Sequence, residues 1–124
     1  MEKTNFAEII LEKYQNGQRY FSDYDLYYEN FDDQNLADII FENCFIASSF
    51  KRTNLKNAKF IHSNIKTSDF SYADLSHAHL EHLVVDGATF TGAKIDQIYF
   101  ENNDFHGSSI SIIDLSLWIK QDNL

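Results

Sequence analysis

The chain has 124 residues, of which 44% are hydrophobic and 15% aromatic, enough to bury the core of one domain. Its net charge of −9 excludes nonspecific binding to nucleic acid, because phosphate contacts need a basic surface. No apolar run approaches the roughly 20 residues that cross a bilayer, which excludes a membrane-spanning class.

The N-terminal segment has acids throughout and lacks the pattern of a cleaved signal peptide, so we expect a cytoplasmic location. The single Cys44 agrees with a reducing compartment, since it has no cysteine partner. Residues 1–42 contain ten acidic and three basic residues, whereas residues 43–68 contain five basic residues and no acid. We therefore expect an acidic first third followed by a basic stretch.

The first 18 residues predict a short helix. Asn5 is a good N-cap with Glu8 three residues later, and the apolar residues that follow have helical spacing. Gly17 fits the C-terminal end of such a helix. We expect the helix to cover one end of the structure that follows.

From residue 53 to residue 80, in TNLKNAKFIHSNIKTSDFSYADLSHAHL, every fifth residue is a large apolar one. A step of five turns an α-helix by about 500°, which would spread these side chains over all its sides. In a straight strand, odd steps alternate between the two faces. The remaining solution is a backbone that turns a corner once per five residues, so that each short segment again faces one interior.

The period extends well beyond this stretch and predicts the core. The predicted inward centres are Phe45, Phe50, Leu55, Phe60, Ile65, Phe70, Leu75, Leu80, Val85, Phe90, Ile95, Phe100, Phe105, Ile110 and Leu115. Earlier centres from Phe21 to Phe41 keep the period but lie one residue out of register, so we expect a one-residue slip at residues 36–45. Two residues before most centres the side chain is small, which indicates a narrow interior. Asn103 falls at such a position, where we expect it to hydrogen-bond a neighbouring coil.

The units TNLKN, AKFIH, SNIKT, SDFSY, ADLSH and AHLEH resemble those of the pentapeptide-repeat protein family. The resemblance implies an all-β solenoid, a right-handed four-sided β-helix of about five coils. ILEKYQNGQRYF also resembles the capping helix of bacterial members, with the pattern Leu-x-x-Tyr-x-x-Gly-x-Arg-x-Phe. We therefore expect a capping helix at 1–18, a β-helix at 19–116 and a C-terminal cap or dimerisation tail at 117–124.

The stacking of coils places few chemically active groups together. His62 and His82 fall in one outward column and are weak candidates for a zinc or nickel site, but polar residues recur at outward positions by chance. We expect no metal, no cofactor and no catalytic residues, since no column unites a nucleophile, a base and an orienting group. Cys44 precedes the centre Phe45, so we expect an outward and inert thiol.

The tail contains three consecutive apolar residues, Leu117, Trp118 and Ile119, just past the last centre. We expect no second long helix, so this segment either folds over the end of the solenoid or packs against a second chain. Dimers joined through C-terminal ends occur in the family that the sequence resembles. We therefore predict an interface at these three residues and a homodimer.

The leading functional interpretation is a noncatalytic protein-interaction scaffold with an unidentified protein partner, and with no direct binding to nucleic acid or membrane. The family resemblance offers an alternative, in which an acidic rod mimics duplex DNA and binds a type II topoisomerase such as DNA gyrase. Lys51, Lys56 and Lys66 interrupt the acidic columns and weigh against it. A purely structural domain is the third interpretation.

Overall fold

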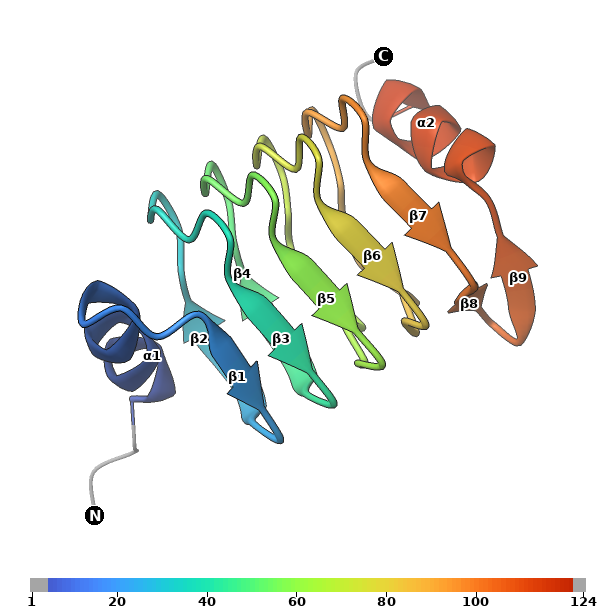
Figure 1. The fold of residues 1–124 in the computed structure, drawn as a ribbon. Helices are drawn as coiled ribbons and strands as arrows, with labels where there is room; N and C mark the ends of the chain where they lie inside the picture. The colour runs from blue at the N-terminus through green and yellow to red at the C-terminus, as the bar shows by residue number, and fades with distance from the viewer. Residues whose placement is uncertain (1–4, 122–124) are drawn as a thin grey trace.

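The structure, a computed structural model, describes residues 5–121 and shows a β-solenoid with a helix at each end (Figure 1). In chain order its elements are α1 (Phe6–Gln15), β1 (Tyr20–Ser22), β2 (Asp25–Asn30), β3 (Ile40–Glu42), β4 (Phe45–Ser49), β5 (Lys59–Ile61), β6 (His79–Glu81), β7 (Tyr99–Glu101), β8 (Asn103–Phe105), β9 (Ser108–Ile110) and α2 (Ile112–Gln121). No helix in the described part of the chain is both long and apolar enough to cross a membrane. Residues 1–4 of the predicted cap and 122–124 of the predicted tail lie outside the described residues.

Helix α1 covers the N-terminal end of the solenoid, as the sequence predicts (Figure 1). The side chain of Asn5 accepts a hydrogen bond from the backbone N–H of Glu8, and Ile10 is fully buried. The hydroxyl of Tyr14 donates to the carbonyl of Ala37 at 2.7 Å, which joins the helix to the first coil. The buried Glu29 accepts from the N–H of Ala7 at 2.9 Å, so a carboxylate faces the positive end of the helix dipole.

One face of the solenoid is a parallel sheet of five strands in the order β1-β3-β5-β6-β7. The chain returns to this face five times and so completes four coils, one fewer than the five that we expected from the sequence. On the next face β2 pairs with β4 in parallel. The predicted fold class is confirmed, because each short segment returns to the same side of a shared interior.

Stacked phenylalanine rings fill the narrow core. Phe31, Phe50, Phe70 and Phe90 form a column in which neighbouring ring centroids are 4.9, 5.1 and 5.2 Å apart. The interplanar angles of these pairs are 8°, 5° and 7°, so the rings stack in parallel. The stack forms because these phenylalanines occupy equivalent inward positions on the same face of successive coils.

Small inward residues link the coils by hydrogen bonds. The hydroxyls of Ser48, Thr53 and Ser68 donate to main-chain carbonyls of the preceding coil. Asn103 performs the same task with an amide, and its predicted structural role is confirmed by its hydrogen bonds to Leu80 and Leu83. These contacts satisfy polar groups that would otherwise be buried without partners.

The predicted position of the register slip is wrong. Phe21 pairs with Phe41 twenty residues later, but Phe41 pairs with Phe60 only nineteen later. Most corners contain one residue with positive φ, whereas β4 runs straight through residues 45–49 without one. The missing residue therefore lies between Ile46 and Phe50, and not at residues 36–45.

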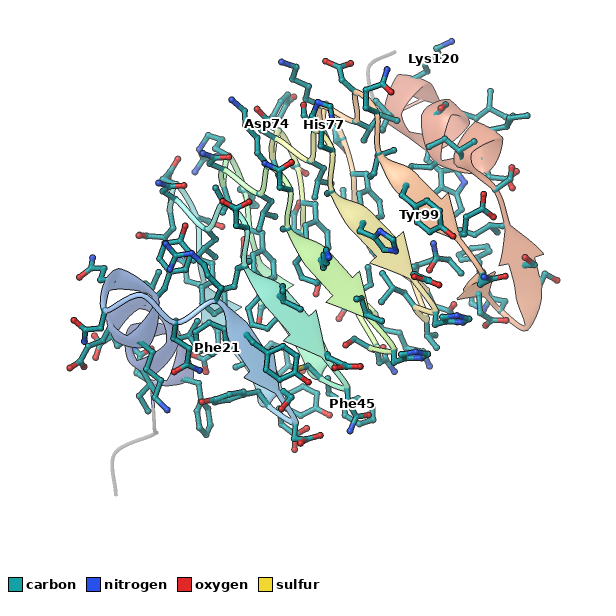
Figure 2. All side chains as sticks on the ribbon, viewed as in Figure 1. Phe21, Phe45, Asp74, His77, Tyr99 and Lys120 are labelled. Carbon is teal, nitrogen blue, oxygen red and sulfur yellow. The ribbon has the colours of Figure 1, made fainter. Side chains whose placement is uncertain are left out.

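The slip moves one predicted core residue to the surface. Phe45 is 50% exposed, and Figure 2 shows its side chain on the outside of the coil. Ile46 is buried in its place. The two neighbours are both large and apolar, so the five-residue pattern alone cannot distinguish them.

The C-terminal end also differs from the expectation, because a second helix, α2, covers it (Figure 1). Beyond β7 the chain forms an antiparallel hairpin, β8–β9, and the coil pattern does not continue to residue 116. Phe105 and Ile110 in the hairpin, and Ile95 in the last coil before it, are only partly buried, and Leu115 is buried from a helix rather than a coil. Apart from Phe45, the other predicted centres are buried inside the solenoid.

The sequence contains a start signal for α2. The hydroxyl of Ser111 accepts from the N–H of Asp114, whose carboxylate accepts from the N–H of Ser111 at 2.8 Å. This is a reciprocal capping box. The apolar spacing of Leu115, Trp118 and Ile119 fits one helix face and supports the same conclusion.

Candidate protein-interaction surface

Several cations on the outer surface of the solenoid pair with nearby carboxylates. Arg52 Nε lies 2.7 Å from Asp33 Oδ1, and its guanidinium lowers the pKa of the Asp33 carboxyl. Two lysine pairs also join neighbouring coils, Lys51–Asp69 at 3.8 Å and Lys56–Asp74 at 3.7 Å, whereas Lys94–Asp96 at 3.7 Å lies within one coil. The surface that contains these pairs therefore presents alternating charges and not a continuous acidic column.

The two histidines of the predicted column are neighbours. The rings of His62 and His82 stack with centroids 4.6 Å apart and an angle of 5°. Parallel rings direct their nitrogen lone pairs along parallel lines, whereas a shared metal ion needs lone pairs that converge. Among residues 5–121 no group of three histidine, cysteine or acidic side chains is placed to hold a metal ion.

Glu81 lies between this stack and the neighbouring row of the sheet. Its carboxylate is 2.6 Å from His79 Nε2 and 3.4 Å from His82 Nε2. The hydrogen bond with His79 lowers the pKa of the Glu81 carboxyl below its usual 4.5. The imidazole of His79 also stacks on Tyr99, with ring centroids 4.1 Å apart.

Cys44 points into the solenoid, which corrects the expectation of an outward thiol. The slip lies beyond Cys44, so this residue occupies the small inward position before Ile46 and is buried. Its sulfur lies 3.3 Å from the carbonyl oxygen of Glu42. Burial raises the pKa of the Cys44 thiol, which favours the protonated form.

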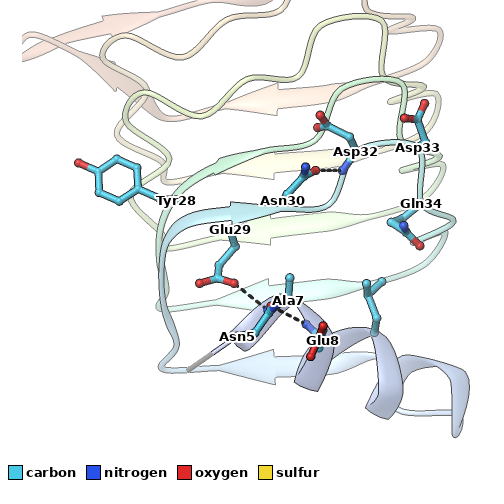
Figure 3. A pocket seen from close by; sticks show the side chains of 10 residues that line it. Asn5, Ala7, Glu8, Tyr28, Glu29, Asn30, Asp32, Asp33 and Gln34 are labelled. Atoms are coloured by element: carbon cyan, nitrogen blue, oxygen red, sulfur yellow. Dashed lines mark hydrogen bonds between the residues drawn. The ribbon is translucent and has the colours of Figure 1, made fainter. Parts of the chain in front are cut away.

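A hollow of about 690 Å³ lies between α1 and the first coil (Figure 3). Three of its four acidic side chains serve the fold: Glu29 binds α1, Asp32 accepts from the N–H of Lys51 at 2.8 Å, and Asp33 pairs with Arg52. The fourth, Glu8, lies in the first turn of α1. Most of the acidity of this hollow is therefore explained by contacts within the protein.

A second hollow, of about 300 Å³, lies on the face formed by β2 and β4. We call it the aromatic groove, and it is lined by Tyr27, Tyr28, Phe45, Ile46, Ala47, Asn64, Lys66 and Thr67. Tyr27 is 47% exposed and Tyr28 84% exposed, and Figure 3 shows the Tyr28 ring pointing away from α1. Together with Phe45, three exposed aromatic side chains surround one depression.

The aromatic groove coincides with the register slip. Tyr27 pairs with Ala47 and Asn30 with Ser49, so two residues of β2 oppose one residue of β4. Tyr28, with φ of 59°, is one of the two bulged residues. The sequence interpretation missed this surface because it placed Phe45 inside. The signal available to it was the consecutive aromatic pair Tyr27–Tyr28 between inward centres.

The predicted interface residues of the tail lie on α2. Leu117 is 51% exposed, as expected for a surface contact. Trp118 instead packs on Phe105, with ring centroids 5.2 Å apart, and Ile119 is partly buried. Ile112 and Ile113 are exposed on the same helix as Leu117.

Comparisons with known proteins agree with this architecture. The profile of a family described as "Pentapeptide repeat region" matches residues 34–110. A search of curated proteins finds no significant match. The solved structure of QnrB1, described as a plasmid-mediated fluoroquinolone resistance protein, is similar at a TM-score of 0.66 and 22% identity over 68% of this chain and 44% of QnrB1.

Two cyanobacterial pentapeptide repeat proteins also match. HetL of Nostoc, described as involved in heterocyst differentiation regulation, has a TM-score of 0.34 and 18% identity over 73% of this chain and 51% of HetL. Rfr23 of Cyanothece has a TM-score of 0.27 and 17% identity over 82% of this chain and 92% of Rfr23. The chain thus spans about half the length of QnrB1 and HetL.

Proposed function

Because the chain belongs to the pentapeptide repeat family, we propose that it is a noncatalytic protein-interaction scaffold. Members of this family are generally noncatalytic scaffolds. The observation that carries the proposal is the aromatic groove, where Tyr27, Tyr28 and Phe45 are exposed on a hydrogen-bonded backbone. Aromatic side chains are enriched at the centres of protein interfaces, where they contribute large contact areas.

The scaffold function is tested by capture of a partner. The immobilised full chain is incubated with lysate of the organism that encodes it, and bound proteins are identified by mass spectrometry. We expect a protein that is retained on the immobilised chain and released when free chain is added in excess. The same protein should bind the purified chain directly. Retention of no protein above the level on blank resin would contradict the proposal and favour a purely structural domain.

We do not propose mimicry of duplex DNA. Mimicry needs continuous negative columns, but Lys51, Arg52 and Lys56 pair with carboxylates of adjacent coils. The likeness to QnrB1 at 22% identity shows a shared fold alone. DNA gyrase supercoiling should therefore be unchanged at a micromolar excess of this protein, and inhibition would reverse this conclusion.

A homodimer is a second proposal, supported by the apolar surface of α2. Ile112, Ile113 and Leu117 are exposed and have no apolar cover within the described part of the chain. Burying them against a second copy about a two-fold axis would remove this surface from water. Light scattering should give twice the monomer mass of 14.5 kDa for the natural chain and the monomer mass for Leu117→Glu. A monomeric natural chain at tens of micromolar would exclude the dimer.

A further inference from the structure

We infer that the aromatic groove binds an extended, acidic segment of a partner protein, which inserts an apolar side chain beside Phe45. This inference rests on the proposed scaffold function and names the chemistry of the partner. Four observations support it: the exposed aromatic side chains, the fixed backbone beneath them, the shape of the surface and its charge.

The aromatic side chains provide the apolar contact. Tyr27, Tyr28 and Phe45 line one hollow whose floor contains the small Ala47. Ala47 lies between Tyr27 on the preceding coil and Lys66, which lines the same hollow from the following coil, so its short side chain leaves the depression open. A volume of about 300 Å³ accommodates one aliphatic or aromatic side chain rather than a folded ligand.

The backbone beneath the groove is held in place by hydrogen bonds between coils. The N–H of Phe45 donates to the carbonyl of Tyr24 at 3.0 Å, and that of Ile46 to Asn64 at 2.7 Å. On the inner side, the hydroxyl of Ser48 donates to the carbonyl of Leu26 at 2.6 Å. A surface ordered in this way loses little conformational entropy on binding, which favours affinity.

The shape of the surface favours an extended occupant. The aromatic groove shares Phe45 and Asn64 with a hollow that includes His62 and His82. At its other end it shares Tyr28, Ala47 and Thr67 with a hollow that reaches Lys51 and Asp69. These are successive positions along the chain direction. Three shallow hollows in sequence fit a segment of extended chain better than a single compact ligand.

The charge of the surface favours an acidic occupant. Neither the aromatic groove nor the hollow beside His62 contains a carboxylate in its lining. Lys66 makes no ion pair with any residue between 5 and 121. Asp86, whose carbonyl accepts from the N–H of Thr67, is itself 3.3 Å from His106 Nδ1. On a protein of net charge −9, Lys66 is the one charged side chain among the described residues that line the aromatic groove, and the exposed Asp25 next to Phe45 lies outside that lining. The free ammonium of Lys66 therefore complements a partner carboxylate.

The third hollow agrees with this assignment. Its two acidic residues are both engaged within the protein, since Glu29 binds the N–H of Ala7 and Asp69 lies 3.8 Å from Lys51. Both carboxylates there thus have partners within the protein, which leaves Lys66 as the lysine of the three linings without an ion pair among the described residues.

The experiment selects phage-displayed random dodecapeptides on the immobilised full chain and measures the affinity of the selected peptides by fluorescence anisotropy. The groove variant is Tyr27→Ser with Phe45→Ser, and its matched control is Tyr72→Ser with Tyr99→Ser, two exposed tyrosines outside the groove. The charge variant is Lys66→Glu, and its control is Lys59→Glu, another exposed lysine without an ion pair among the described residues. Circular dichroism and thermal melting establish that each variant is folded.

We expect selected peptides that combine aspartate or glutamate with an aromatic or aliphatic residue. Their Kd should rise by about tenfold for the groove variant and for Lys66→Glu, and remain unchanged for both controls. Peptides rich in lysine or arginine, equal losses in the controls, or selection of no peptide would each overturn the inference. Self-association that the groove variant abolishes would also overturn it, because the occupant would then be a second copy of the chain.

The partner-capture experiment separates this inference from the scaffold function. A captured partner that binds the groove variant as tightly as the natural chain leaves the scaffold function standing and overturns the inference. Failure to capture any partner contradicts the scaffold function itself.

Discussion

Asn103 hydrogen-bonds the backbone of Leu83 in the preceding coil, its side-chain oxygen accepting from the N–H at 2.9 Å. The amide group of the same side chain donates to the carbonyl of Leu80 at 3.0 Å. One buried polar residue thus satisfies two main-chain groups that have no solvent access.

Asn103→Leu should therefore destabilise the protein although leucine has a similar size. Removing one partner leaves buried groups unsatisfied, at a cost of about 1–3 kcal/mol for each group. Urea unfolding followed by circular dichroism measures the change. Glu101→Ala, at an exposed position two residues earlier, is the control and should change stability by no more than about 0.5 kcal/mol.

Ile46→Ala and Phe45→Ala test the position of the register slip. Ile46 is buried, and its truncation should lower the free energy of unfolding by about 2–5 kcal/mol. Phe45 is half exposed, so the loss of its larger side chain should cost less. Chemical denaturation of both variants decides the matter, and the reverse order would place the slip upstream of Phe45, as the sequence pattern predicts.

Cys44 should react with a thiol reagent only when the protein unfolds. The thiol is buried and its pKa is raised by that burial, so little thiolate is present or accessible near neutral pH. The rate of labelling by Ellman's reagent at pH 8 should be slow in buffer and fast in denaturant. Fast labelling of the native chain would show that the Cys44 thiol is exposed on the outer surface.

Glu81 should contribute to the loss of stability in acid. Its pKa is lower in the folded protein than its usual 4.5 because of the hydrogen bond with His79, so its contribution is present above pH 4.5. The contribution is lost as the pH falls through the lowered folded value. Melting temperatures measured from pH 6 to pH 3 should fall less steeply for Glu81→Gln than for the natural chain. Parallel curves would show that the contact with His79 has no part in acid unfolding.

The sequence by itself determined the solenoid. A five-residue apolar period is incompatible with both a helix and a straight strand, so local geometry alone requires a chain that turns a corner in every repeat. The helix at Phe6–Gln15 was predictable for a similar reason, because its N-cap and apolar spacing are local signals. The inward amide of Asn103 followed from its place in the period.

Only the tertiary structure decided where the register changes. Phe45 and Ile46 are both large and apolar, so the sequence does not show which of them faces inward. In the structure Ile46 faces inward, and the N–H groups of Phe45 and Ile46 donate to the carbonyls of Tyr24 and Asn64 in the neighbouring coils. The inward position of Cys44 and the outward position of Tyr28 both follow from that choice.

The sequence predicted the column of His62 and His82, but the geometry of the outer surfaces depends on contacts between coils for the same physical reason. The aromatic groove exists because two coils of unequal length lie side by side. Helix α2 covers the C-terminal end, where Trp118 packs on Phe105. The parallel stacking of His62 and His82 is likewise a relation between coils twenty residues apart. A repeat pattern specifies which residues face inward, whereas the contacts between successive coils determine which outward residues meet.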